Sequence, residues 1–282
     1  MTPARDGENQ AADLPAPLVA PEAYDDEYYR HACGGAVEWS QSEGAEVAGL
    51  YPGSLERAHL QAGDVLVDIG CGRGELLAVA AQHGAARAIG LEYAPAVLPL
   101  ALKTLESHGV RDRAAVLQAD ARAIPVADDT ADLVTMLDVV EHLGPRELAL
   151  TLMEARRILK PGGRVFIHTF PTRTVYGVTY RLQRLSRPSR WRSWPADPRL
   201  PYERSMHVNE QTPAMLRRSL RRSGFAQVNV SLGRWIHTEF VPEERYKRLY
   251  HWLANIPGLT RFGVADIWGE AVNPPNPRDA RN

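Results

Sequence analysis

The sequence predicts an α/β fold: a doubly wound, mostly parallel sheet of seven strands with helices on both faces. Short apolar runs alternate with helix-forming stretches over residues 65–171, and glycine or a Pro-Gly-Gly turn closes several of them. The chain of 282 residues, 44% hydrophobic and 24% charged, is long enough to bury one core of this kind.

Each strand is expected where an aliphatic run is short, and each helix where apolar residues recur every three to four positions. The strands are expected at residues 65–70, 86–92, 114–120, 131–138, 164–171, 226–232 and 262–272. The helices are expected at residues 75–84, 94–109, 145–163, 212–224 and 242–256. Gly84 ends the first of these helices and Pro95 lies near the start of the second, where each residue type is favoured.

The chain is expected to form one main domain with two additions. Residues 1–22, rich in Ala, Pro and acids, are expected to be a disordered leader, and residues 23–60 to be N-terminal helices that cover a pocket. Residues 61–282 are expected to form the main domain, with a largely irregular cap insertion at 172–206.

The net charge and the cysteine content limit the expected binding partners and the expected cellular compartment. A formal net charge of −1 predicts no bulk attraction to nucleic acid or to a membrane. Two cysteines, Cys33 and Cys71, are too few for a disulfide framework and favour a reducing compartment. The N-terminal residues lack the basic start and apolar middle of a signal peptide, so the expected location is cytoplasmic.

A glycine-rich turn follows the first strand in DVLVDIGCGRGELL, residues 64–77. In an open parallel sheet such a turn lies in the ligand site. Its glycines follow G-x-G-x-G, whereas dinucleotide sites use G-x-G-x-x-G, and Glu75 stands where the third glycine would be needed. A carboxylate there would face a pyrophosphate with the wrong sign, and Asp68 adds a second acid before the turn. The turn therefore disfavours an anionic cofactor.

The stretch DIGCGRG resembles the D/E-x-G-x-G-x-G motif of class I S-adenosylmethionine-dependent methyltransferases, which have a Rossmann-like fold. The resemblance, strongest over about residues 60–171, implies S-adenosylmethionine as cofactor. It places Glu92 at the ribose hydroxyls and Asp120 at the adenine amino group. The residues expected to bind the cofactor are Asp68, Gly70, Cys71, Gly72, Gly74, Glu92, Asp120, Ala121 and Asp138.

Methyl transfer requires an aligned nucleophile, exclusion of water and, for a hydroxyl acceptor, removal of a proton. The candidate catalytic residues are His142, in LDVVEHL after the fourth strand, and His207, in SMHVNEQTP before a later helix. An equally good interpretation is that His207 has no role in the site and is only a neighbour of Asn209 at a helix cap. His168 is expected to be a strand-end residue with no catalytic part.

These two segments resemble the O-methyltransferases of ubiquinone biosynthesis and, in part, small-RNA 2′-O-methyltransferases. In both groups such residues can hold a divalent metal such as Mg²⁺ or Zn²⁺ that binds the acceptor's oxygens. The resemblance implies a metal set of Asp138, Glu141, His142 and His207. Two other interpretations stay open, in which His142 packs near the cofactor without chemistry or acts directly as a general base.

The cap insertion is locally basic and aromatic. Only Asp197 and Glu203 oppose its eight arginines, which are Arg173, Arg181, Arg184, Arg187, Arg190, Arg192, Arg199 and Arg204. Such a patch suits an anionic or aromatic small molecule, an anionic membrane surface, RNA, or no ligand at all. We favour a small-molecule acceptor, because RNA-methylating relatives usually append an RNA-binding module for which the chain has no obvious room. A nucleic-acid partner is not expected, and the sequence does not set the oligomeric state.

The expected function is transfer of a methyl group from S-adenosylmethionine to a small-molecule acceptor, at a hydroxyl oxygen, in quinone or specialised-metabolite biosynthesis. Three alternatives stay open: metal-assisted RNA 2′-O-methylation, methylation of carbon or nitrogen in a small molecule, and a cofactor-binding partner protein without turnover. The cofactor half of such a fold does not encode the acceptor.

Overall fold

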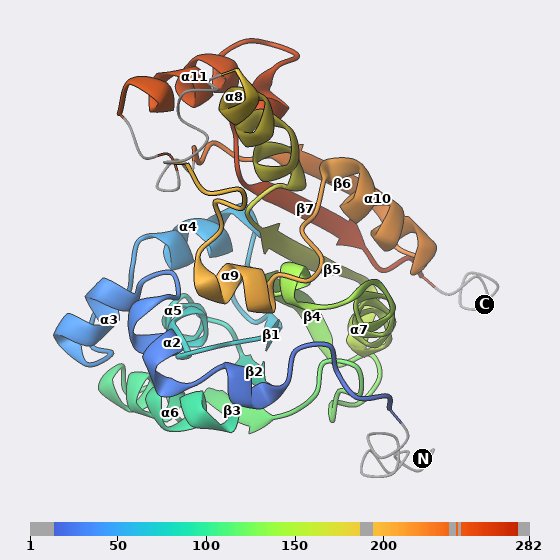
Figure 1. Ribbon diagram of the computed structural model, residues 1–282. Coiled ribbons are helices and arrows are strands. Elements are labelled where there is room, and N and C mark those ends of the chain that lie inside the picture. The colour runs from blue at the N-terminus through green and yellow to red at the C-terminus, as the bar shows by residue number, and fades with distance from the viewer. Residues whose placement is uncertain (1–13, 187–193, 237–240, 242–243, 276–282) are drawn as a thin grey trace.

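A seven-stranded open sheet forms the centre of the protein (Figure 1), in a computed structural model that describes residues 14–186, 194–236, 241 and 244–275. The strands are β1 (Val65–Ile69), β2 (Arg87–Glu92), β3 (Ala114–Gln118), β4 (Ala131–Leu137), β5 (Leu159–Thr169), β6 (Ala226–Leu232) and β7 (Ile267–Val272). Their order in the sheet is β3-β2-β1-β4-β5-β7-β6. The predicted seven-stranded, mostly parallel sheet is confirmed.

The sheet changes direction between β1 and β4. From β1 the chain moves outward to β2 and β3, then returns to place β4 and β5 on the other side, and all of these pairings are parallel. β7 is antiparallel to both β5 and β6. The carboxyl ends of β1 and β4 therefore flank a crevice, which is where open α/β sheets bind ligands.

Helices cover both faces of the sheet, as predicted. The helices of the main domain are α4 (Leu50–Arg57), α5 (Glu75–Gln82), α6 (Leu98–Ser107), α7 (Pro145–Ile158) and α10 (Pro213–Arg222). Figure 1 shows α4, α5 and α6 on one side and α7 and α10 on the other. Alternate residues of β1 enter the two cores: Leu66 packs with the α5 side, whereas Val67 and Ile69 pack with the α7 side.

Two predicted boundaries differ from the structure. The helix expected over 145–163 ends at Ile158, and the following residues begin β5. The Asn273 side chain donates to the Leu159 carbonyl at 2.7 Å, and the Gly162 N–H donates to the Asn273 carbonyl at 2.8 Å. These bonds hold residues 159–163 against the chain that follows β7. The last strand begins at Ile267, after a 3₁₀ turn at Thr260–Phe262.

The region expected to be irregular contains helices. They are η4 (Val175–Tyr180), α8 (Arg181–Leu185) and α9 (Pro201–Met206), while residues 187–193 lie outside the described residues. Tyr176, Tyr180 and Trp194 pack against Tyr246 and Tyr250 of α11 (Glu244–Ala254), so that this region has a small core of its own. We call the described residues of 172–206 and 241–262 the cap.

The expected disorder of the leader is wrong for residues 14–22. The Leu18 N–H donates to Glu147 Oε1 at 2.9 Å, and Arg122 Nη1 donates to the Pro15 carbonyl at 2.8 Å. Val19 is buried, so apolar contact and hydrogen bonds together hold the segment on the domain. Residues 1–13 lie outside the described residues.

Short helical elements complete the N-terminal part and the connections. They are η1 (Pro21–Ala23), α2 (Asp26–His31), α3 (Ala36–Ser42), η2 (Pro95–Val97) and η3 (Val140–His142). Among the described residues, no helix is long and apolar enough to cross a membrane.

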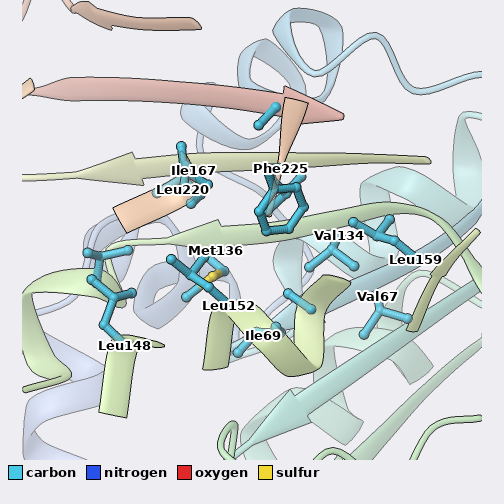
Figure 2. Packing of buried hydrophobic residues seen from close by; sticks show 14 of the residues in the cluster. Val67, Ile69, Val134, Met136, Leu148, Leu152, Leu159, Ile167, Leu220 and Phe225 are labelled. Atoms are coloured by element: carbon cyan, nitrogen blue, oxygen red, sulfur yellow. The ribbon is translucent and has the colours of Figure 1, made fainter. Parts of the chain in front are cut away.

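The α7 side of the core gives a direct test of the packing (Figure 2). Leu152 is fully buried between α7 and the sheet, whereas the next residue, Met153, points to solvent. Leu152→Ala should lower the free energy of unfolding by about 2–5 kcal/mol, because a cavity remains. Met153→Ala should change it by less than about 0.5 kcal/mol. Urea unfolding followed by circular dichroism checks both values, and equal effects would contradict this packing.

Candidate active site

A cavity of about 210 Å³ lies at the carboxyl ends of β1, β2 and β4. The turn after β1, the ends of β2 and β4 and the loop after β3 line one part of it. Of the nine residues predicted to bind the cofactor, eight line the cavity. Gly74 does not, because it lies behind the turn, where a Cβ atom would be 3.4 Å from Ala101.

The three glycines of the turn all have left-handed backbone conformations, with φ of 75° at Gly70, 50° at Gly72 and 78° at Gly74. Residues with side chains are strained there, which explains the G-x-G-x-G spacing. At Gly70 a Cβ would also come within 2.5 Å of Val139. The Gly70 N–H donates to the Leu91 carbonyl and the Gly72 N–H to Glu92 Oε2, so neither is available to an anion.

The buried carboxylate of Glu92 is held by four protein donors. Its Oε1 accepts from the N–H groups of Tyr93 at 2.7 Å and Ala94 at 3.1 Å and from the Tyr29 hydroxyl at 3.3 Å. Its Oε2 accepts from the Gly72 N–H at 2.8 Å. Burial raises the pKa of Glu92, and these hydrogen bonds counter that rise. The acid at the end of β2 is thereby fixed in orientation beside the glycine turn.

The other two predicted acids have different surroundings. Asp68 is buried at the end of β1 and accepts a hydrogen bond of 2.6 Å from the Thr135 hydroxyl, and burial raises its pKa to about 7. Asp120 makes a two-oxygen ion pair with Arg122, whose Nη2 lies 2.7 Å from Asp120 Oδ2. Asp120 keeps part of its side chain exposed at the cavity wall.

The cover of the cavity comes from the N-terminal part of the chain. Tyr24, Tyr28 and Tyr29 line it together with Cys33, Gly34, Leu50 and Tyr51, while α3 does not reach it. Arg73, in the glycine turn, is buried in an ion pair of 2.8 Å with Glu75 and donates to the carbonyls of Tyr29 and Gly34. The pairing of Glu75 with Arg73 was not predicted from the sequence. An arginine inside a glycine turn was the available signal.

Three of the residues predicted for catalysis and metal binding come together at the other end of the cavity. The potential ligand atoms of Glu141, His142 and His207 lie within 4.8 Å of one another. Glu141 Oε2 accepts from the Thr169 hydroxyl at 2.8 Å. Glu141 Oε1 and His207 Nδ1 are buried and have no hydrogen-bond partner among the described residues. Buried polar atoms are normally satisfied, so these two indicate a ligand position.

Burial shifts the three groups of this cluster toward their neutral forms. Burial, with a contribution from Asp138, raises the pKa of Glu141 to about 8. Burial, with a contribution from His207, lowers the pKa of His142 to about 3, and burial lowers that of His207 to about 4. Both imidazoles are therefore unprotonated and able to accept a hydrogen bond or bind a cation. The Tyr24 hydroxyl, which sequence reasoning did not single out, is hydrogen-bonded to His142 Nδ1 at 3.1 Å.

Asp138 does not join this cluster, which corrects the four-residue metal set. His168 Nδ1 donates to Asp138 Oδ1 at 2.6 Å, and His168 Nε2 lies 3.6 Å from Asp266 Oδ2. The imidazole also lies against the Trp268 ring, with 4.3 Å between ring centroids. Burial would lower the pKa of His168, but the two carboxylates outweigh it and raise the pKa to about 10. His168 is therefore a protonated strand-end residue that binds Asp138.

The cap contributes aromatic residues to the cavity. Its lining includes Tyr202 from α9, and Phe170 and His207, which flank the first cap segment on either side, line the cavity as well. None of the described cap arginines lines the cavity, and Arg199 is paired with Asp197 and Glu210. The expected arginine contact with an anionic substrate is therefore not seen in the described residues. Arg187, Arg190 and Arg192 lie outside them.

Comparison with known proteins agrees with this geometry. Residues 67–167 match the family model described as a methyltransferase domain. This part of the chain resembles a methyltransferase domain. It begins within β1 and ends within β5, so it includes the glycine turn, Glu92, Asp120 and the segment with His142. The resemblance predicted from the sequence is confirmed.

Curated methyltransferases are similar to part of the chain. The ubiquinone biosynthesis O-methyltransferase of Pseudomonas paraeruginosa is 35% identical over 141 residues, which are 47% of this chain and 57% of that protein. The 27-O-demethylrifamycin SV methyltransferase of Amycolatopsis mediterranei is 32% identical over 124 residues, 44% of this chain and 42% of that protein. The chain thus spans about half the length of these relatives.

A solved structure shares the fold over nearly the whole chain. A chain of the complex between the Haloferax volcanii Trm112 methyltransferase activator and the putative methyltransferase aligns with a TM-score of 0.60. The alignment covers 91% of this chain and 98% of that chain at 18% identity. The sheet with helices on both faces is therefore a known fold.

The ion pairs of His168 predict a particular pH dependence of stability. Because the folded-state pKa is raised to about 10, their contribution is fully present below the unfolded-state pKa of about 6.5 and is lost as pH rises through 10. His168→Gln should therefore destabilise most at pH 6 and progressively less toward pH 10. Urea unfolding of both proteins at several pH values measures this difference. A difference that does not change with pH would exclude a protonated His168.

Proposed function

We propose that this protein transfers a methyl group from S-adenosylmethionine to a hydroxyl oxygen of a small-molecule acceptor. One observation carries the proposal: a single cavity joins the residues of the cofactor motif to a buried cluster with two unpartnered polar atoms. The first end suits the cofactor and the second suits a polar group of an acceptor. The O-methyltransferase relatives support the same chemistry.

The proposed cofactor pose follows the walls of the cavity. Asp120 and Ala121 would contact the adenine, Glu92 the ribose, and the Gly70–Gly72 turn with Cys71 the methionine portion. Asp68 and Asp138 lie on the same wall. S-adenosylmethionine carries a sulfonium and an amino group, and an acidic wall is favourable for both. Asp120 is paired with Arg122 and Asp138 with His168, so Glu92 and Asp68 are the acids of this wall for which the described residues show no cationic partner.

The transfer is a displacement at the methyl carbon. The acceptor oxygen forms a bond to that carbon while the bond to sulfur breaks, and the cofactor is left as a neutral thioether. His142 is placed to accept the hydrogen bond of the acceptor hydroxyl and then its proton, which passes on to solvent. A pKa of about 3 makes His142 a weak base, so alignment of the oxygen is its main contribution and proton loss comes late. Tyr24 fixes the imidazole through Nδ1, and His207 lies against its ring.

The acceptor is proposed to be a flat, weakly charged molecule. Tyr24, Tyr28, Phe170 and Tyr202 form the wall around the His142 end of the cavity, and aromatic walls favour stacking with planar ligands. The cavity presents no described arginine that is not already paired with a carboxylate. A quinone-type ring or an aromatic specialised metabolite fits these properties. Transfer to carbon or nitrogen of such a molecule is the alternative.

A divalent metal is a second proposal for the same site. Two imidazoles and a carboxyl group are donors that suit Zn²⁺ better than Mg²⁺, and the unpartnered atoms of Glu141 and His207 point to an absent ligand. Glu141, His142 and His207 would hold the ion, whereas Asp138 is bound to His168. Such a metal would lower the pKa of the acceptor hydroxyl.

The proposed activity is tested with cofactor that carries a deuterated methyl group. The protein is incubated with this cofactor and a small-molecule extract of the source cells, with and without a chelator, and products are identified by mass spectrometry. We expect a labelled metabolite in both samples. Loss of label in the chelator sample alone would establish the metal.

Glu92→Gln is the control for this experiment. It should abolish labelling because it replaces the carboxylate at the proposed ribose position, and calorimetric titration should show weaker cofactor binding. An absence of label with the wild-type protein, despite measured cofactor binding, would contradict a small-molecule acceptor.

The contact between Tyr24 and His142 gives a second prediction. Tyr24→Phe should lower kcat by roughly 10-fold and leave the affinity for cofactor unchanged, because it frees the imidazole without altering the cofactor wall. Tyr180→Phe is the matched control, since its hydroxyl bonds the Pro195 carbonyl in the cap core, away from His142. Steady-state kinetics of both variants decide the point. Equal losses would show that any missing tyrosine hydroxyl has this effect.

A further inference from the structure

The outer surface of the cap exposes large apolar side chains in a regular pattern. Leu182 and Leu185 are three residues apart on α8 and therefore share one side of it, and Val178 lies about one turn earlier in the π-helical η4. We call these three residues the stripe. Leu182 is 62% exposed and Leu185 is 55% exposed. The opposite side of this segment, with Tyr176, Tyr180 and Gln183, packs into the cap core. The segment therefore packs into the cap core on one side and exposes the apolar stripe to solvent on the other.

A second helix adds to this surface. Trp252 of α11 is 58% exposed, although its large ring is among the most costly apolar groups to leave in water. The Gln183 side chain donates to the Tyr246 carbonyl at 3.1 Å, which joins α8 to α11. Figure 1 shows both helices at the end of the cap that lies farthest from β1 to β3. The stripe and Trp252 thus belong to neighbouring helices of the outer cap.

Both helices are basic. Residues 175–185 contain Arg181 and Arg184 and no acid. α11 contains three cationic residues, Arg245, Lys247 and Arg248, and one acid, Glu244. Glu244 is paired with Lys247 at 2.5 Å. The surface therefore combines exposed aliphatic and indole groups with a local excess of positive charge, in a chain whose formal net charge is −1.

The combination of exposed apolar side chains and positive charge distinguishes between the ligands considered for the cap. Gripping an anionic substrate needs arginines at the cavity, and the described cap arginines do not line it. If the cap were only a solvated loop without a ligand, the exposed apolar side chains of Leu182, Leu185 and Trp252 would have no role. Interfacial helices, by contrast, place leucine and tryptophan in the acyl boundary of a bilayer and arginine at anionic headgroups.

We infer that the outer face of the cap, formed by Val178, Leu182, Leu185 and Trp252 with Arg181, Arg245 and Arg248, docks on an anionic lipid bilayer. Apolar side chains enter the boundary below the headgroups, and the arginines contact lipid phosphates or carboxylates. The same cap carries Tyr202 of the cavity wall, so docking would fix the orientation of that wall relative to the bilayer. The inference does not rest on the proposed function, because binding to lipid is measured without turnover.

The experiment is co-sedimentation of the full-length protein with vesicles. Neutral vesicles of phosphatidylcholine are compared with vesicles that contain roughly a third phosphatidylglycerol. We expect binding to the anionic vesicles, weakened by added salt, and little binding to the neutral ones. The double variant Leu182→Asp with Leu185→Asp should reduce the bound fraction by at least about 10-fold, because it places charge in the boundary region.

Met153→Asp is the matched control. Met153 is 59% exposed on α7, outside the cap, so the same chemical change should leave vesicle binding as it is in the wild type. Thermal unfolding of each variant checks that it is folded. As a second measurement, tryptophan emission should shift to shorter wavelength on anionic vesicles, and Trp252→Phe should remove most of that shift.

Three outcomes would overturn the inference. The first is that the wild type does not sediment with anionic vesicles. The second is that the double variant binds as well as the wild type. The third is that Met153→Asp weakens binding as much as the double variant does. A dimer in sedimentation velocity that the double variant dissociates would instead assign the surface to a second copy of the chain. That result would also overturn the lipid inference.

Discussion

One buried guanidinium, that of Arg73, joins the floor of the cavity to its cover. The floor is the glycine turn after β1, and the cover is the N-terminal segment whose carbonyls at Tyr29 and Gly34 accept from Arg73. Glu75 supplies the opposite charge, and neither side chain of this pair is more than marginally exposed. Loss of one partner of a buried ion pair typically costs about 3–5 kcal/mol, because the other charge is left without compensation. The closed shape of the cavity thus depends on a contact within the cofactor motif itself.

The two ends of the cavity differ in their polar groups. At the cofactor end, Glu92 is held by hydrogen bonds and Asp120 by an arginine, whereas at the other end burial favours the neutral forms of Glu141, His142 and His207. Methyl transfer from a sulfonium removes positive charge from the cofactor. An acidic wall next to a neutral one therefore favours binding of the charged cofactor over retention of the neutral product.

Local features of the sequence were sufficient for much of this description. The short aliphatic run of β1 and the glycine spacing each report a backbone conformation, so the sheet and the turn could be predicted from neighbouring residues. The ion pairs of His168 could not, because they require the pairing of Leu137 with His168 in one direction and of His168 with Trp268 in the other. The leader was also missed, since its hold on the domain comes from Glu147 and Arg122, more than a hundred positions away.

The cap is built from two segments of the chain, and this has a consequence for the order of folding. The bond between Gln183 and Tyr246 spans 63 positions, and α10 and β6 lie between them. Closing so long a loop lowers the entropy of the chain before the contact adds any stabilisation, so such contacts form late in folding. The glycine turn and Glu92, separated by 20 positions, can assemble much earlier. A nascent chain would thus complete the cofactor end of the cavity first, and the enclosing wall that contains Tyr202 would be the last part to form.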